Sequence, residues 1–119
     1  MVLVDTSIWI DHFRAANPQL QRLLNDTRVT MHPYIIAELA CGDIGNQPDI
    51  LTLLHTLIQQ PVLSLTEFLH FIQSHTLYAS GLGMVDVHLL GSCKLTESKI
   101  WTKDKKLKAV AARLDLLYS

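Results

Sequence analysis

Four acidic residues, far apart in the sequence, stand where a carboxylate would lie at one edge of a parallel sheet. Asp5 and Asp104 each follow a short apolar run of strand length. Glu38 and Asp86 each lie near the start of a segment with a helical pattern. Mg²⁺ and Mn²⁺ take hard oxygen ligands such as carboxylates, and these ions commonly act on phosphate esters. The four acids together therefore predict a divalent-metal site.

Each of these acids, taken alone, also has an ordinary structural explanation. Asp5 and Asp104 each suit the N-cap of a following helix, a role worth about 1 kcal/mol. Asp86 in a first helical turn is favoured by the helix dipole. For Glu38 the apolar neighbours leave two alternatives, an exposed position on a narrow polar stripe or a buried carboxylate that needs a partner. The joint placement of the four acids is what favours a metal site.

Other residue types that support chemistry give weaker signals. Thr6 and Ser7 directly follow Asp5, and hydroxyls beside a carboxylate suit a hydrated metal with few direct ligands. Ser7 and Cys41 have no activating base visible in the sequence, which disfavours nucleophilic catalysis. The six histidines show no metal-ligand spacing, and we expect them at the surface or half-buried in helices.

Two other acid-based functions are disfavoured because an acid is missing. A signalling receiver domain needs a phosphate-accepting Asp near the middle of the chain, and residues 50–66 contain none. A phosphatase with a nucleophilic Asp usually has a second acid two positions later, where this chain has Ser7.

Charge is distributed unevenly along the chain, although the formal net charge is only −1. Residues 1–93 hold three arginines against eight acids, a net charge of −5. Residues 94–113 hold six lysines and one arginine against two acids, a net charge of +5. A lysine-rich segment suits contact with a phosphate backbone or the solvated face of an amphipathic helix, and the two are compatible.

Composition predicts a single packed domain over residues 1–119. Hydrophobic residues make up 49% of the chain, and none of its apolar runs approaches the roughly 20 residues of a membrane span. No signal peptide is visible, and Cys41 and Cys93 are expected to be buried thiols. We therefore expect a cytoplasmic protein that has no membrane segment.

Strand-length apolar runs alternate with helical patterns, which predicts an α/β fold with an open, doubly wound parallel sheet. Ligands of such sheets bind outside the carboxyl ends of the strands, where Asp5 and Asp104 are expected. We expect about five short strands, over residues 2–5, 28–31, 61–65, 99–102 and 115–117. The expected helices cover residues 7–14, 33–41, 48–59, 66–77, 85–95 and 105–114, with a further helix starting at Pro18.

Four segments resemble, in order, the acidic motifs of the PIN-domain nucleases. They are VDTSIWID at residues 4–11, PYIIAEL at 33–39, GMVDVHLL at 83–90 and IWTKDKKL at 100–107. Together they extend over nearly the whole chain, and its short length is similar to that of the VapC-type toxins of prokaryotic toxin–antitoxin pairs.

The resemblance implies a single-domain α/β/α sandwich and an Mg²⁺- or Mn²⁺-dependent endoribonuclease. It also implies homodimerisation and inhibition by a small cognate antitoxin protein. On this mapping Asp5, Glu38, Asp86 and Asp104 are the catalytic, metal-binding acids. Thr6, Ser7 and Thr102 are their supporting hydroxyls.

The expected mechanism is hydrolysis of RNA by metal-activated water, with Asp5 and Asp86 as direct ligands. Glu38 and Asp104 would bind the metal directly or through water, and the products would carry a 5′-phosphate and a 3′-hydroxyl. The alternative is a catalytically idle RNA- or protein-binding module of the same fold. Phosphates that flank the cleaved bond would contact Lys103, Lys105, Lys106 and Lys108.

Overall fold

A four-stranded parallel sheet forms the centre of the molecule, with the strand order β3-β2-β1-β4. In the computed structural model, which describes residues 1–119, the strands are β1 (Val2–Val4), β2 (Val29–Met31), β3 (Ile58–Gln59) and β4 (Lys99–Trp101). All three strand pairs are parallel. The carboxyl ends of the strands therefore meet at one edge of the sheet, which is where the chain continues from β1 and β4 into Asp5 and Thr102.

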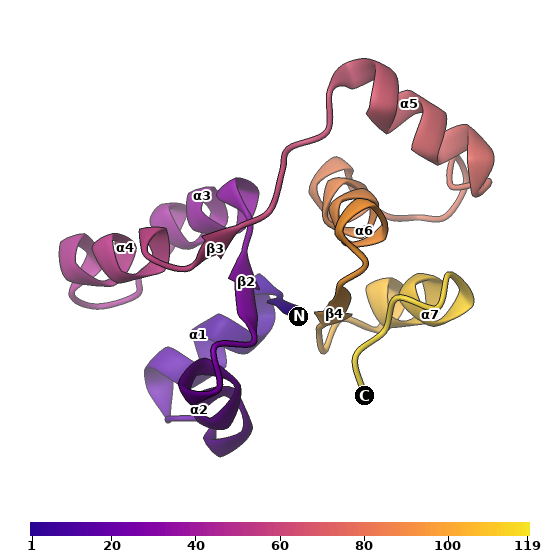
Figure 1. Cartoon of the computed structure of the whole chain (residues 1–119). Coiled ribbons are helices and arrows are strands. Elements are labelled where there is room, and N and C mark those ends of the chain that lie inside the picture. The colour runs from indigo at the N-terminus through magenta and orange to yellow at the C-terminus, as the bar shows by residue number, and fades with distance from the viewer.

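Seven helices cover the two faces of this sheet. Figure 1 shows α1 to α4 on one side of the strands and α5, α6 and α7 on the other. This arrangement confirms the expected α/β/α sandwich. The helices are α1 (Thr6–Arg14), α2 (Pro18–Asn25), α3 (Pro33–Cys41), α4 (Gln47–His55), α5 (Leu65–Ser74), α6 (Met84–Thr96) and α7 (Lys105–Arg113).

Several helices begin at capping residues that the sequence supplies. The Asn17 side chain accepts a hydrogen bond from Leu20 N at 3.0 Å, directly before Pro18 at the first position of α2. Ser64 and Glu67 form a reciprocal capping box at the start of α5. These local signals explain why the expected helix starts agree closely with the structure.

The hydrophobic core consists of 26 buried residues from the sheet and from the helices on both of its sides. All three residues of β1 are at most 1% exposed, as expected for a central strand covered on both faces. The core therefore fixes the strand ends that lead into the acidic residues. No helix has the length and apolar character needed to span a membrane.

Two expected strands are wrong. The third strand is Ile58–Gln59, at the end of a segment predicted to be helical, and no strand forms over residues 61–65. Backbone pairing with β2 ends at Gln60, whose N–H donates to Met31 O at 2.7 Å, because Pro61 has no N–H to continue it. Residues 115–117 contribute only a single bridge, between Leu117 and Ile100. The sheet thus has four strands instead of about five.

The predicted environments of three residues are also wrong. Cys41 is exposed at the end of α3, whereas Cys93 is buried as expected. His32 and His88 are buried, 0% and 7% exposed, instead of lying at the surface or half-buried in helices. His32 Nδ1 accepts a hydrogen bond from Tyr34 N at 2.9 Å, so this side chain caps α3 from inside the core. Burial and the nearby His88 lower the pKa of His32 to about 4.

Candidate active site

Asp5 and Thr102 are brought side by side because β1 and β4 are neighbours in the sheet. Val4 pairs with Trp101, and Asp5 N donates to Trp101 O at 2.9 Å. The next residue, Thr102, donates its hydroxyl to Asp5 Oδ2 at 2.7 Å. Both side chains are buried, with Thr102 1% and Asp5 7% exposed. A buried carboxylate needs such partners, because desolvation without them is unfavourable.

Asp5 does not cap the helix that follows it. It occupies the N-cap position of α1, but its side chain accepts no hydrogen bond from the first backbone N–H groups. Instead, Ser7 donates its hydroxyl to Asp5 Oδ2 at 3.3 Å, the same oxygen that Thr102 contacts. Both hydroxyls thus converge on Oδ2, and Oδ1 remains available to a metal ion. The capping alternative for Asp5 is therefore wrong.

Glu38 occupies an exposed position on α3, which agrees with the first of its two predicted alternatives. Its carboxylate is oriented by Thr6, the first residue of α1, which donates its hydroxyl to Glu38 Oε1 at 2.6 Å. This contact links α1 to α3, so the residue directly after Asp5 fixes a second acid. Thr6, one of the three predicted supporting hydroxyls, therefore contacts Glu38 and not Asp5.

Asp104 caps α7, in agreement with its structural explanation. Its Oδ1 accepts a hydrogen bond from Leu107 N at 2.9 Å. Its own backbone N–H donates to Thr102 Oγ1 at 3.1 Å. The Thr102 hydroxyl therefore accepts from Asp104 and donates to Asp5, which ties the two acids together. Because the cap uses only Oδ1, Asp104 Oδ2 is left for other partners.

The environment of Asp86 contains the negative charges of the other three carboxylates. It lies in the first turn of α6, whose N-cap is Gly83, and it is half-buried. Its pKa is raised from 3.8 to about 6, mainly by burial and then by the negative charges of Asp5, Asp104 and Glu38. A carboxylate surrounded by three others prefers to be neutral unless a cation is present.

The donor set consists of carboxylate oxygens, the hard ligands that suit Mg²⁺ or Mn²⁺, and it does not form a closed cage. No group of three or more His, Cys, Asp or Glu side chains lies close enough together to hold a metal ion in the present geometry. Direct coordination needs oxygens at about 2.0–2.1 Å, whereas charges influence one another over several ångströms. Carboxylates that share one electrostatic environment without converging fit a cation held by few direct ligands and several waters.

The sequence analysis missed one ion pair at the rim of this site. Lys103 Nζ lies 2.5 Å from Asp11 Oδ2, and both side chains are about half exposed. Lys103 N also lies 3.5 Å from Ser7 Oγ, a borderline hydrogen-bond distance. No signal in the sequence links Lys103 to Asp11, because the two residues are 92 positions apart and meet only in the folded protein. The other three lysines that are expected to contact phosphates, Lys105, Lys106 and Lys108, are all exposed.

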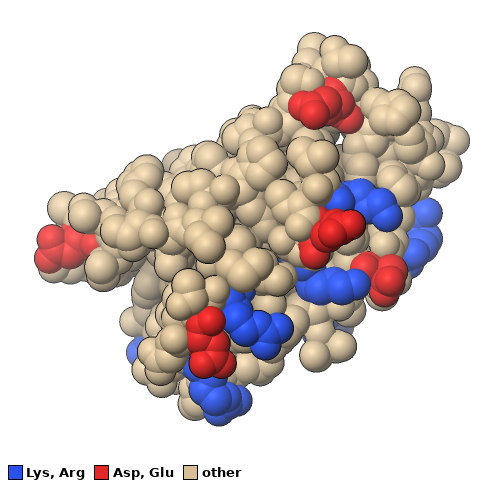
Figure 2. Space-filling model, viewed as in Figure 1, with Lys and Arg blue, Asp and Glu red and all other residues tan.

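The lysine-rich segment does not create a large basic surface on the face drawn in Figure 2. On that face, Lys and Arg side chains lie next to Asp and Glu side chains, and no extended area carries a single sign of charge.

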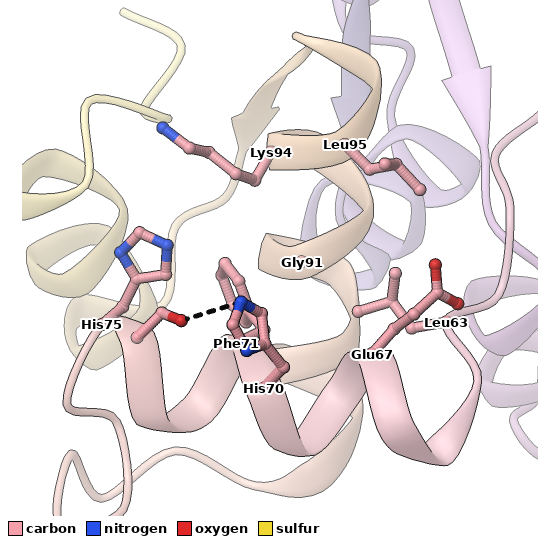
Figure 3. A pocket seen from close by; sticks show the side chains of 9 residues that line it. Leu63, Glu67, His70, Phe71, His75, Gly91, Lys94 and Leu95 are labelled. Atoms are coloured by element: carbon pink, nitrogen blue, oxygen red, sulfur yellow. Dashed lines mark hydrogen bonds between the residues drawn. The ribbon is translucent and has the colours of Figure 1, made fainter.

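A separate groove between α5 and α6 does not compete with the acidic site as a centre of chemistry. It has a volume of about 260 Å³, and Figure 3 shows its mixed lining, which includes Leu63, Glu67, His70, Phe71, Lys94 and Leu95. Its one acid, Glu67, is occupied by the capping box, where it accepts a hydrogen bond from Ser64 N at 2.8 Å. Ser74 Oγ and His70 Nε2 are paired at 3.2 Å. None of the four predicted acids lines this groove.

Comparisons with known proteins agree with this fold and its motifs. The family described as PIN domain matches residues 2–113. Ribonuclease VapC32 from two strains of Mycobacterium tuberculosis is 46% identical over 113 residues, which cover 94% of this chain and 91% of that protein. The crystal structure of PAE2754 from Pyrobaculum aerophilum superposes with a TM-score of 0.63. It is 15% identical, covers 96% of this chain and 94% of its own, and therefore supports the fold alone.

Proposed function

Because the chain belongs to the PIN-domain family, with VapC-type relatives, we propose that it is a metal-dependent endoribonuclease. It would be the toxin of a toxin–antitoxin pair. The observation that carries the proposal is the environment of Asp5, a buried carboxylate that caps no helix and is held by two hydroxyls. The second support is the raised pKa of Asp86, which reflects burial and three neighbouring carboxylates.

In the proposed site, the four carboxylates have two kinds of role. Asp5 and Asp86 are the direct ligands, and burial of Asp86 increases the gain when a cation balances its charge. Thr102 and Ser7 hold the Asp5 carboxylate in one orientation through their hydroxyls. Glu38 and Asp104 reach the cation directly or through water.

A bound Mg²⁺ or Mn²⁺ would activate a water molecule and neutralise negative charge on the phosphodiester. The chain itself contributes a fixed carboxylate geometry and lysines for the flanking phosphates. With water as the nucleophile, the products carry a 5′-phosphate and a 3′-hydroxyl. Electrostatic binding of RNA is expected to weaken with salt, and the proposed phosphate contacts are Lys103, Lys105, Lys106 and Lys108.

The remaining parts of the proposal concern the surroundings of the enzyme. Residues 1–119 form one nuclease domain that acts in the cytoplasm. The active form is a homodimer, and a small cognate antitoxin protein binds and inhibits it. The similarity to Ribonuclease VapC32 is the support for these parts of the proposal.

The deciding experiment incubates total cellular RNA with purified wild type and with Asp86→Asn. Each protein is tested with Mg²⁺, with Mn²⁺ and with EDTA, after circular dichroism has shown that the variant is folded. Discrete fragments that require both the metal and Asp86 are the expected result. RNA that stays intact with folded, antitoxin-free wild type would support the alternative of a catalytically idle binding module.

A further inference from the structure

Lys103 is the basic residue whose position beside the acidic site is fixed by contacts. It directly precedes Asp104 and directly follows Thr102, the hydroxyl that holds Asp5. Its backbone N–H and Asp5 Oδ2 lie against the same Ser7 hydroxyl, at 3.5 and 3.3 Å. A lysine has a flexible four-carbon stem, so from this position its ammonium group can reach the carboxylates.

The ammonium group nevertheless points to a different acid. Lys103 Nζ pairs with Asp11 Oδ2 on α1, one helical turn beyond Ser7. The Asp11 carboxylate accepts a hydrogen bond only from Lys103 and shares no hydrogen-bond partner with the four acids of the site. The Lys103 ammonium group thus lies against α1, one helical turn farther along this helix from Asp5 than Ser7 is.

The Lys103–Asp11 ion pair bears on the charge balance of a site with several carboxylates. Without a bound cation the carboxylates repel one another, and a nearby ammonium group would relieve that repulsion. A lysine that moved into the cluster would compete directly with a divalent cation for the same oxygens. An acid outside the cluster that binds the lysine removes this competition.

We propose that Asp11 is a positioning residue that holds Lys103 away from the acidic cluster and keeps those carboxylates free for a divalent cation. The inference rests on the proposed metal site and adds a residue outside it. Asp11 binds neither the metal nor RNA in this scheme. Because the ion pair is half exposed, we expect an effect on metal affinity of about two- to fivefold.

The test is a double-mutant cycle on Mn²⁺ affinity, measured by isothermal titration calorimetry without RNA and at constant ionic strength. The variants are Asp11→Asn, Lys103→Met and the double variant. We expect Asp11→Asn to weaken Mn²⁺ binding about two- to fivefold. Lys103→Met should have little effect in wild type, and in the Asp11→Asn protein it should restore nearly the wild-type affinity. This rescue is the signature of competition by the lysine.

The inference is overturned if the effects of Asp11→Asn and Lys103→Met on Mn²⁺ affinity are additive. Two independent surface charges would each change the affinity by the same factor whether or not the other residue is substituted. Asp5→Asn identifies the site, since it should lose Mn²⁺ binding. The pair Lys99–Asp115, 3.7 Å apart at the other end of β4, supplies a matched control. Asp115→Asn should leave Mn²⁺ affinity unchanged.

The outcomes also separate this inference from the proposed function. Wild type that binds Mn²⁺ with an additive cycle overturns the role of Asp11 and leaves the metal site intact. Wild type that binds no Mn²⁺ overturns both. If thermal melting shows that Asp11→Asn is poorly folded, Asp11→Ser gives the same cycle, because it also removes the charge.

Discussion

Asp5 and Asp104 both stand at the N-cap of a helix, yet only the Asp104 side chain accepts a capping hydrogen bond. Each follows one of two neighbouring parallel strands, and each stands at the N-cap of the next helix. Asp104 is exposed and caps α7 through Leu107 N. Asp5 is buried, accepts no capping hydrogen bond, and is held by the hydroxyls of Thr102, which directly follows β4, and of Ser7 in α1.

The difference arises from the donors that reach each carboxylate. Thr102 lies across the β1–β4 pair from Asp5. Its hydroxyl is 2.7 Å from Asp5 Oδ2, whereas the Ser7 hydroxyl is 3.3 Å from the same atom. No hydroxyl donates to the Asp104 carboxylate. This carboxylate accepts its hydrogen bond from Leu107 N, in the helix that Asp104 precedes. The position of an Asp before a helix therefore does not show whether its side chain caps that helix, whereas the hydrogen-bond donors around it do.

The strongest test of this comparison exchanges each Asp for Asn. We expect Asp5→Asn to lower metal-dependent RNA cleavage by more than about 100-fold, because a direct ligand loses its charge. Asp104→Asn should lower it by about tenfold or less, since Asn still caps α7. Initial cleavage rates of both folded variants at saturating Mn²⁺ decide the point. Equal losses would mean that the two acids are equivalent ligands.

A smaller effect is expected from the hydroxyl that joins the two acids. Thr102→Val removes the donor to Asp5 and the acceptor for Asp104 N without a change in shape. Loss of a group that orients a ligand typically lowers metal affinity about 10- to 100-fold, and we expect the lower end. Titration with Mn²⁺ measures this loss of metal affinity. Thr30→Val is the matched control, because Thr30 is a buried hydroxyl of β2 bonded to Val2 O.

Thr30→Val should destabilise the protein while leaving Mn²⁺ affinity unchanged. A Thr102→Val protein with wild-type affinity would contradict the proposed role of the hydroxyl.

The capping role of Asp104 predicts a change in stability rather than in chemistry. Asp104→Ala should lower the free energy of unfolding by about 1 kcal/mol, because Leu107 N loses its acceptor. Asp104→Asn should lower the free energy of unfolding by only a small part of that value, because Asn can also cap the helix. Urea denaturation of the metal-free proteins, followed by circular dichroism, compares them. The capping assignment fails if Ala and Asn destabilise the protein equally.

The smallest expected effect concerns Asp86 and depends on pH. Its pKa of about 6 in the folded protein exceeds the ordinary 3.8, so the folded state binds the proton more tightly. Protonation therefore stabilises the metal-free protein at acidic pH, and this contribution is lost as the pH rises through about 6. Asp86 is half-buried, so screening by solvent limits the effect to about 1 kcal/mol.

Asp86→Asn removes the charge and should make the metal-free protein more stable than wild type at neutral pH. The advantage should disappear near the ordinary pKa of 3.8. Urea denaturation at several pH values tests this, with excess Mn²⁺ expected to stabilise wild type alone. A stability difference that does not vary with pH would exclude electrostatic strain at Asp86.

Most helices were predictable because their signals are local. The helices that begin after Asn17, His32 and Asp104 start at caps that the sequence displays. The third strand was not predictable, since Ile58 is 54% exposed and β3 has only two residues. Its pairing depends on β2, a distant segment, and a short exposed run gives no apolar period. The burial of His32 and His88 likewise depends on packing between helices.

The sequence by itself determined the family, through four acidic motifs in a fixed order, and it determined which side chains carry negative charge. It also determined the parallel sheet, because strand-length runs alternate with amphipathic helices. Only the tertiary structure decided how each carboxylate is used. Strand pairing placed Thr102 on Asp5, helix packing placed Thr6 on Glu38, and α1 supplied Asp11 to Lys103. Hydrogen bonds and charges act through space, so their partners follow from the fold and not from the order of residues.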